Sequence, residues 1–220
     1  MHIKCMQDMF VGGSDTAATA LQWIMAELIN NPGLMHKAQD EVRREFAGRS
    51  KVTEDGGIRN LNYMNLVIKE ALRLHPPLPL LLPRECQSDN CLVLGYDVPK
   101  GTMVLVNAWA INRDPNYWGD KAEDFIPERF EQSNVDFKGT DFEYTPFGAG
   151  RRMCPGMALG LMNIELALAG MLYHFDWELP AGTKGAGELD MAEEMGVTVR
   201  RHQDLLLVPT VRVPLPIEYR

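Results

Sequence analysis

The sequence predicts a mainly α-helical fold with small β-sheets. Apolar residues recur at helical spacing in residues 3–29, 32–46 and 62–75. A fourth apolar segment follows Pro155, and before it the apolar period changes to two, which is typical of short strands. No linker or repeat divides the 220 residues, so we expect one domain, or part of one, over residues 1–220.

The first two predicted helices are separated by the break "NNPG". The first helix is apolar on much of its circumference, which indicates a core helix. Asn31 can cap the second helix, and Pro32 can open it because proline lacks the N–H that would go unpaired there. The apolar positions of the second helix are Leu34, Met35, Ala38, Val42 and Phe46.

The third predicted helix is ended by the proline-rich "HPPLPLLLP". "CLVLGYDVPKGTMVLVNAWA" then has β-rich runs around a Gly-Tyr-Asp turn and a Pro-Lys-Gly turn, which predicts a hairpin. Residues 112–144 are irregular. A long helix follows Pro155, and "VTVRRHQDLLLVPTVRV" predicts two strands.

Composition excludes several classes of protein. The net charge of −8 argues against a nucleic-acid-binding protein, which needs excess Lys and Arg on its binding face. The cysteines contain no CxxC pair, which argues against structural zinc or a disulfide framework.

Asn163 and Glu165 interrupt the longest apolar run, so we expect no membrane span in the chain. "MHIKCMQDMF" is typical of a helix interior, so we expect that an upstream part is missing.

The segment "PFGAGRRMCPGM" places Cys154 in a constrained, positively charged loop. Because Pro155 suits the first turn of the helix that follows, Cys154 is expected at or next to the helix N-cap. The free N–H groups, the helix dipole, Arg151 and Arg152 favour a thiolate there over a thiol. Glycines let the backbone turn sharply and approach a ligand closely. They are Gly148, Gly150 and Gly156.

Two chemistries use such a sulfur: nucleophilic catalysis, which also needs a His base, and axial ligation of haem iron. The flanking residues favour ligation over both catalysis and an inert buried cysteine. Phe147, Gly150, Arg152, Cys154 and Gly156 match F-x-x-G-x-R-x-C-x-G, and the loop closely resembles the cysteine-ligand signature of the cytochrome P-450 family. The resemblance implies that Cys154 is the haem iron ligand and that these residues, with Gly148, contact the cofactor.

The stretch "VGGSDTA" places Gly12 and Gly13 inside an apolar helix, where each costs about 1 kcal/mol relative to alanine. It resembles the oxygen-binding helix motif of the family. The resemblance implies that the glycines form a flat site over the porphyrin and that Asp15 and Thr16 relay protons for dioxygen activation. Ala17 departs from the hydroxyl residue common after that threonine. The alternative is a small-residue packing face with a solvated Ser-Asp-Thr edge.

The stretch "KEALRLHPP" places Glu70 and Arg73 three residues apart on one helix face. Most such pairs are solvated and contribute under about 1 kcal/mol. This pair lies in an apolar helix and resembles the structural ion pair of the family, and Arg129 in "PERF" resembles the third member of that network. By resemblance, Arg84 and Arg152 would each pair with a haem propionate. A surface arginine is the alternative for Arg84.

The histidines offer rival metal ligands. His75 and His174 have no second ligand at a zinc-like spacing, so we expect structural roles for both.

The motifs occur in the order found in the family, and "GGSDTAAT" with "VTVRRHQDLLLVPT" is similar to its plant microsomal branch. The resemblance implies the C-terminal part of the cytochrome P-450 fold, without the N-terminal part and its endoplasmic reticulum membrane anchor. It also implies a haem-dependent monooxygenase that inserts one atom of dioxygen into a hydrophobic small molecule, with electrons from NADPH through a cytochrome reductase.

Three alternatives stay open. The chain could be a truncated, non-catalytic product that does not hold haem. A haem-thiolate dehydratase or isomerase is a second alternative, against which Asp15 and Thr16 argue. A cysteine hydrolase is the least favoured, because no Cys-His-Asn order is evident. The positions expected to contact substrate, Val11, Ala17 and "PLPLLLP", are apolar and indicate only a hydrophobic or amphipathic molecule.

Overall fold

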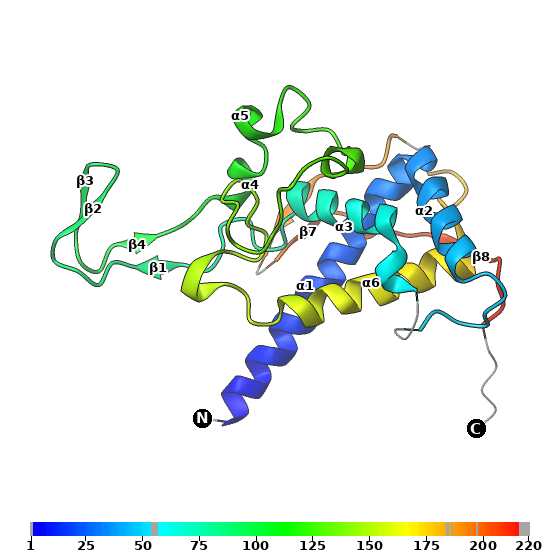
Figure 1. Cartoon of the computed structure of the whole chain (residues 1–220), viewed down its shortest axis with the longest axis horizontal. Helices are drawn as coiled ribbons and strands as arrows, with labels where there is room; N and C mark the ends of the chain where they lie inside the picture. The colour runs from blue at the N-terminus through cyan, green and yellow to red at the C-terminus, as the bar shows by residue number, and fades with distance from the viewer. Residues whose placement is uncertain (1, 54–56, 184, 186, 197, 216–220) are drawn as a thin grey trace.

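The chain is built around the long helix α1 (His2–Asn30), against which the other long helices pack (Figure 1). They are α2 (Pro32–Glu45), α3 (Asn62–Leu74) and α6 (Met157–His174), which also contact one another. The computed structural model describes residues 2–53, 57–183, 185, 187–196 and 198–215. The four predicted helices are confirmed, with most ends shifted by a single residue.

The core lies where these four helices meet. Fully buried apolar side chains come from every one of them, including Ile24, Leu28, Val42, Val67, Leu168 and Leu172. Full burial of such a side chain contributes about 1.5–3 kcal/mol relative to its exposure. The helix crossings are therefore the main source of stability, and they form the platform that carries the loops between α3 and α6.

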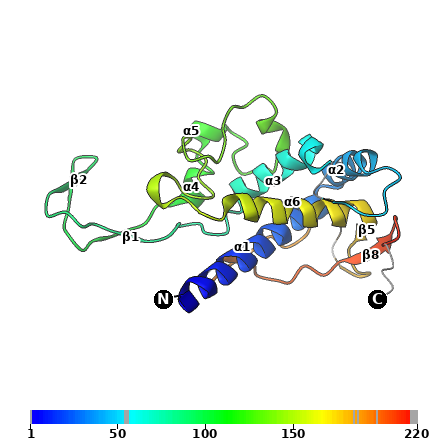
Figure 2. The same cartoon turned by 60° about the horizontal axis from the view of Figure 1, so that its bottom comes forward.

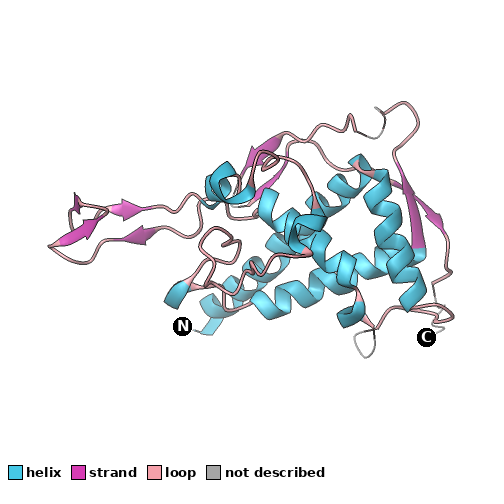
Figure 3. Cartoon of the chain, turned by 45° about the horizontal axis from the view of Figure 1, so that its top comes forward, coloured by secondary structure: helices cyan, strands magenta, loops and turns pink. Residues whose placement is uncertain are grey.

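Short antiparallel strand pairs surround the helices (Figure 3). An arm that projects from the helices holds β1 (Arg84–Glu85) with β4 (Met103–Val104), and β2 (Cys91–Val93) with β3 (Tyr96–Val98). The C-terminal part holds β5 (Phe175–Glu178) with β8 (Val208–Val211), and β6 (Glu193–Met195) with β7 (Val199–Arg201). The predicted fold class, mainly α with small sheets, is confirmed.

Single helical turns shape the irregular segment between α3 and α6. They are α4 (Ala108–Ile111), α5 (Pro115–Trp118) and the 3₁₀ turns Pro127–Phe130 and Gly150–Arg152; another 3₁₀ turn, Ile58–Asn60, precedes α3. The side chains of Asn107 and Asp114 cap α4 and α5 by accepting hydrogen bonds from backbone N–H groups.

Asn31 stands at the N-cap of α2 and Pro32 opens the helix, as predicted, but the expected side-chain cap bond is absent. The Asn31 side chain accepts no hydrogen bond from the first turn of α2. Its Nδ2 donates instead to the Glu27 carbonyl oxygen at 2.9 Å, one turn back in α1. The amide therefore satisfies the C-terminal end of one helix rather than the N-terminal end of the next.

The arm corrects one further expectation. The β2–β3 hairpin turns at Leu94 and Gly95, which have φ of 51° and 85°, so Tyr96 and Asp97 lie in β3 and not in a Gly-Tyr-Asp turn. Arg84 begins β1, and residues 77–83 before it form turns, bends and irregular backbone rather than a strand. The prolines of that stretch lack the N–H groups that a strand ladder needs.

The N-terminal half of α1 projects beyond the other helices (Figures 1 and 2). Phe10 on this half is 72% exposed and Val11 is 60% exposed, and on α6 Leu159 is 57% exposed. Large exposed apolar side chains concentrated on a segment mark a surface that contacts another molecule or chain segment.

Helix α6 combines an apolar composition with a core position. By length and composition it alone, among the described residues, could cross a membrane, although we expected Asn163 and Glu165 to exclude this. In the structure, Ile164 and Leu168 pack into the core against the other helices. Burial raises the pKa of the Glu165 carboxyl, and the charge of Arg59 partly offsets this.

Candidate functional site

The cysteine loop, residues 146–156, joins the irregular segment to α6. The Cys154 N–H donates to the Phe147 carbonyl oxygen at 2.9 Å and closes the loop. Gly148 and Gly150 have φ of 73° and 68°, in the left-handed region that residues with a Cβ rarely adopt. The shape of the loop therefore requires glycine at both positions.

Cys154 lies farther from α6 than the sequence predicts. Gly156 is the N-cap and α6 begins at Met157, so Pro155 precedes the helix and does not open it. Pro155 and Gly156 form a turn between the cysteine and the helix. The Cys154 side chain is exposed. An exposed thiol in a closed, hydrogen-bonded loop is available to a ligand from outside.

Aromatic packing fixes the cysteine loop on the core. The Phe147 ring packs edge-on against Phe137, with centroids 5.4 Å apart. Tyr144 is buried just before the loop, and its hydroxyl donates to the Lys69 carbonyl oxygen of α3 at 2.7 Å. Burial raises the pKa of Tyr144 well above its usual value, and the negative charge of Glu70 adds to the rise. Tyr144 therefore stays a neutral hydrogen-bond donor.

Gly12 and Gly13 are exposed residues in the N-terminal half of α1. Beyond the backbone of the helix itself, no described atom lies within 4 Å of where a Cβ would stand on either residue. The Thr16 hydroxyl donates to the Gly12 carbonyl oxygen at 2.6 Å, and the Ser14 hydroxyl donates in the same way to Phe10. Since the Thr16 hydroxyl proton is used within the helix, its oxygen is available as an acceptor.

Asp15 has a partner that the sequence did not reveal. Thr198, next to β7, donates from its hydroxyl to Asp15 Oδ2 at 2.8 Å, and the Thr19 hydroxyl donates to Thr198 Oγ1 at 3.2 Å. The indole N–H of Trp23 donates to the Val199 carbonyl oxygen at 2.9 Å. The sequence held one indication of this contact. Asp15, Thr19 and Trp23 are spaced four residues apart and so lie on one face of the helix.

The structure brings Glu70, Arg73 and Arg129 into one cluster. Arg73 forms a two-pronged pair with Glu70, with both N···O distances at 2.9 Å, and neither side chain is exposed. Arg129 Nε donates to Glu70 Oε1 at 2.8 Å. Arg73 also donates to the carbonyl oxygens of Asn112 and Ala122 at 2.6 and 2.7 Å. The cluster ties α3 to the irregular segment that leads to the cysteine loop.

The two arginines expected at propionates lie apart from that cluster. Arg84 is half-buried in β1 opposite Val104, and Arg152 is exposed in the turn before Cys154. Within the described part of the chain, neither guanidinium has an acidic partner. Both are therefore available to an anionic ligand.

The two histidines have partners within the protein. His75 Nε2 lies 2.7 Å from Glu27 Oε1, and its ring stacks on Trp23 with centroids 4.0 Å apart. His174 Nδ1 lies 2.8 Å from the Val213 carbonyl oxygen. No group of three or more His, Cys, Asp and Glu side chains that could hold a metal ion occurs among the described residues.

These residues fit haem. Cys154 offers one exposed thiol, which suits an iron that would receive its remaining ligands mainly from a macrocycle. The space beside Gly12 and Gly13 is not used by the described chain, and the neighbouring Val11 is an exposed apolar side chain suited to a porphyrin face. Unpaired guanidinium groups match the two carboxylates of the macrocycle edge.

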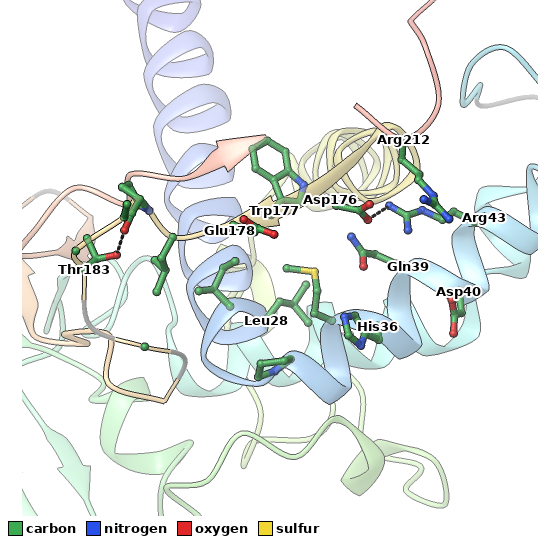
Figure 4. Close-up of a pocket in the computed structure, with 18 residues that line it drawn as sticks. Leu28, His36, Gln39, Asp40, Arg43, Asp176, Trp177, Glu178, Thr183 and Arg212 are labelled. Carbon is green, nitrogen blue, oxygen red and sulfur yellow. Dashed lines mark hydrogen bonds and ion pairs between the residues drawn. The ribbon is translucent and has the colours of Figure 1, made fainter. Parts of the chain in front are cut away.

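A hollow of about 760 Å³ lies elsewhere, between α2 and β5 (Figure 4). Its lining mixes Leu28 and Met35 with charged groups, and Arg43 Nη2 donates to Asp176 Oδ1 at 2.7 Å beside it. The residues predicted for the haem site are not among those that line it. The contact made by Arg43 holds β5 on α2, which indicates a structural role for these residues.

Comparisons with known proteins agree on one family. The cytochrome P-450 family profile matches residues 2–206. Desmethyl-deoxy-podophyllotoxin synthase of Sinopodophyllum hexandrum is 57% identical over 93% of this chain and 39% of the relative. Germacrene A hydroxylase of Barnadesia spinosa is 54% identical over 92% of this chain and 40% of the relative. The chain thus spans about two fifths of the length of these relatives.

A solved structure agrees with the sequence comparisons. A zebrafish cytochrome P-450 solved with abiraterone matches with a TM-score of 0.80 and 32% sequence identity. The match covers 94% of this chain and 46% of the zebrafish chain.

Proposed function

Because this chain belongs to the cytochrome P-450 family and corresponds to the C-terminal part of its fold, we propose that it carries the haem-thiolate centre of a plant monooxygenase. The reaction inserts one atom of dioxygen into a hydrophobic small molecule. NADPH supplies the electrons through a cytochrome reductase at the endoplasmic reticulum membrane. The observation that carries the proposal is the exposed Cys154 thiol in its hydrogen-bonded loop.

Each residue of the site has a role in this proposal. Bound haem would supply the redox chemistry that activates dioxygen. Cys154 holds the iron through its sulfur, and Arg84 and Arg152 pair with the propionates. Gly12 and Gly13 leave room for the macrocycle. The buried ion-pair cluster has a structural role, because its charged groups are paired with one another. Its members are Glu70, Arg73 and Arg129.

Asp15 and Thr16 handle protons in this proposal. The Thr16 hydroxyl is committed to the Gly12 carbonyl, so its oxygen accepts a hydrogen bond from a water or from the reacting oxygen. The exposed Asp15 carboxyl exchanges protons with solvent and passes them to that position. The arrangement favours a monooxygenase over a dehydratase or isomerase, which needs no protons for dioxygen.

We expect the chain to hold haem better when the N-terminal portion of a relative is joined to it. The exposed apolar side chains of α1 and α6 would then be covered. The experiment places the N-terminal portion of the Sinopodophyllum relative before residues 2–220, which gives the completed enzyme. Haem content per chain and soluble yield should both rise above those of residues 1–220 alone. Equal, stoichiometric haem in both proteins would contradict the expectation and would show that residues 1–220 bind haem without the added portion.

Replacing Thr16 with alanine should divert electrons from product to peroxide. Haem content should stay unchanged, because the hydroxyl touches neither the iron ligand nor the propionate partners. The readout is product formed from 7-ethoxycoumarin, and peroxide released, per NADPH consumed by the completed enzyme with reductase. We expect product yield to fall by about 10-fold or more, since positioned proton transfer contributes about 10²–10⁴-fold.

Ser14→Ala is the matched control for Thr16→Ala. Ser14 makes the same kind of bond to Phe10, with the same 2.6 Å distance, two residues earlier in the helix. Its product yield should equal that of the unsubstituted enzyme. If Thr16→Ala leaves the product yield unchanged, Thr16 has no part in the proposed proton relay.

A further inference from the structure

One face of α1 carries a polar stripe through the middle of the helix. Asp15, Thr19, Trp23 and Glu27 follow one another at four-residue intervals and therefore lie on one side. The first three bind residues at the start of β7, which runs beside α1 (Figure 1). Glu27 binds His75 at the end of α3. The stripe thus seats the β6–β7 hairpin on the helix that carries the proposed proton relay.

The direction of each hydrogen bond at Thr198 follows from proton counting. An ionised carboxylate can only accept, so the single hydroxyl proton of Thr198 goes to Asp15 Oδ2. Thr198 Oγ1 must then accept from Thr19, which donates at 3.2 Å. The chain of donors runs in one direction, from Thr19 through Thr198 to Asp15, and ends on the carboxylate.

Hydrogen bonding distinguishes the two oxygens of the Asp15 carboxylate. Thr198 and Thr19 are 5% and 6% exposed, so the bond to Oδ2 is made on the protein side of the helix. Asp15 itself is exposed. Hydrogen bonds to a charged acceptor are short and about twice as strong as neutral ones. Oδ2 is therefore held by Thr198, whereas the other oxygen has no hydrogen bond from the described residues.

The hairpin that carries Thr198 is itself anchored. The Trp23 indole holds the Val199 carbonyl oxygen at 2.9 Å, and Glu193 of β6 lies 3.7 Å from Arg113 Nη2. Arg113 also pairs with Glu123 at 3.0 Å. With such anchors the Thr198 hydroxyl has a defined place relative to α1, which a positioning group requires.

We propose that Thr198 is a positioning residue for proton delivery, acting through the Asp15 carboxylate. This inference rests on the proposed monooxygenase function and adds a residue remote from the known motifs. Thr198 fixes the carboxylate so that its free oxygen faces the relay. Through Thr198, the β6–β7 hairpin thereby affects how much product forms per NADPH consumed.

The test compares two ways of driving the same oxidation in the completed, haem-loaded enzyme. With NADPH and reductase, protons must be delivered to dioxygen. With cumene hydroperoxide, the oxygen arrives already reduced and protonated. Thr198→Val removes the hydroxyl at nearly constant volume, Thr198→Ser retains it, and Asp15→Asn removes the proposed proton carrier. Thr210→Val is the matched control, because Thr210 is an exposed residue of β8. The probe is 7-ethoxycoumarin throughout.

Thr198→Val should lower NADPH-supported product formation by about 3- to 10-fold, part of the 10²–10⁴-fold that positioned proton transfer contributes. The hydroperoxide-supported rate should change by less than about 2-fold, because that reaction needs no proton delivery. Thr198→Ser should restore the NADPH-supported rate, and Thr210→Val should leave both rates unchanged. A second readout needs no turnover: the losses in melting temperature of Thr198→Val and Asp15→Asn should be less than additive, whereas those of Thr210→Val and Asp15→Asn should add.

The contrary outcomes are distinct. Equal falls in both reactions, or no fall with Thr198→Val while Asp15→Asn is impaired, would overturn the positioning role and leave the relay intact. Additive melting losses for Thr198→Val and Asp15→Asn would also overturn it. No effect of Asp15→Asn on the NADPH-supported reaction would contradict the proposed relay itself.

Discussion

Replacing Arg73 with alanine is expected to lower the stability of the fold strongly. The Arg73 side chain is fully buried and makes two bonds to Glu70 and further bonds to the carbonyl oxygens of Asn112, Ala122 and Asp124. Removing it leaves a buried carboxylate without one of its two arginine partners, and three carbonyl groups lose a donor. Breaking a buried ion pair in this way costs about 3–5 kcal/mol, against a total stability of about 5–15 kcal/mol for a typical protein.

Thermal unfolding of the completed enzyme, followed by circular dichroism, measures this effect. Arg73→Lys should be destabilising as well, because an ammonium group cannot replace a planar guanidinium that bridges a carboxylate and several carbonyls. Arg44→Ala is the control, since Arg44 is an exposed arginine of α2. A melting temperature for Arg73→Ala equal to that of Arg44→Ala would show that the buried cluster does not stabilise the fold.

Replacing Cys154 with serine is expected to abolish oxidation of 7-ethoxycoumarin by the completed enzyme. A serine hydroxyl is a poor ligand for haem iron and lacks the electron donation of a thiolate. Loss of a residue that merely supports a metal ligand already costs about 10–100-fold in affinity or activity. We therefore expect the loss of the ligand itself to exceed about 100-fold.

Two controls separate ligation from general damage. Cys91→Ser changes a half-buried thiol of β2, far along the chain from the cysteine loop, and should retain activity. Cys154→His should keep haem in the protein through its imidazole but not restore monooxygenation. Full activity in Cys154→Ser would exclude the sulfur as the functional ligand.

The sequence predicted those parts of the molecule that depend on neighbours along the chain. The long helices follow from apolar periodicity, which is a local property, and the helix ends were correct to within a residue or two. The cysteine loop was found because its glycines, arginines and cysteine lie within eleven residues, in residues 146–156. Both signals are short-range.

The sequence could not show contacts between distant segments. Thr198 meets Asp15 across 183 positions, and no periodicity connects a strand terminus to one turn of a helix. The backbone carbonyls that surround Arg73 carry no side-chain signature at all. The sequence also did not show where α6 starts, because Pro155 suits either the first helical turn or the turn before an N-cap. In the structure, Gly156 is the N-cap and the helix begins after it.

The central claim is that the Cys154 sulfur ligates haem iron, and one spectrum tests it most directly. The completed enzyme is reduced in the presence of carbon monoxide, and the Soret band of the complex is recorded for the unsubstituted protein and for Cys154→His. Thiolate ligation predicts a strongly red-shifted Soret band in the unsubstituted protein and its loss in Cys154→His. An unshifted band in the unsubstituted protein, at the same position as in Cys154→His, would contradict the account.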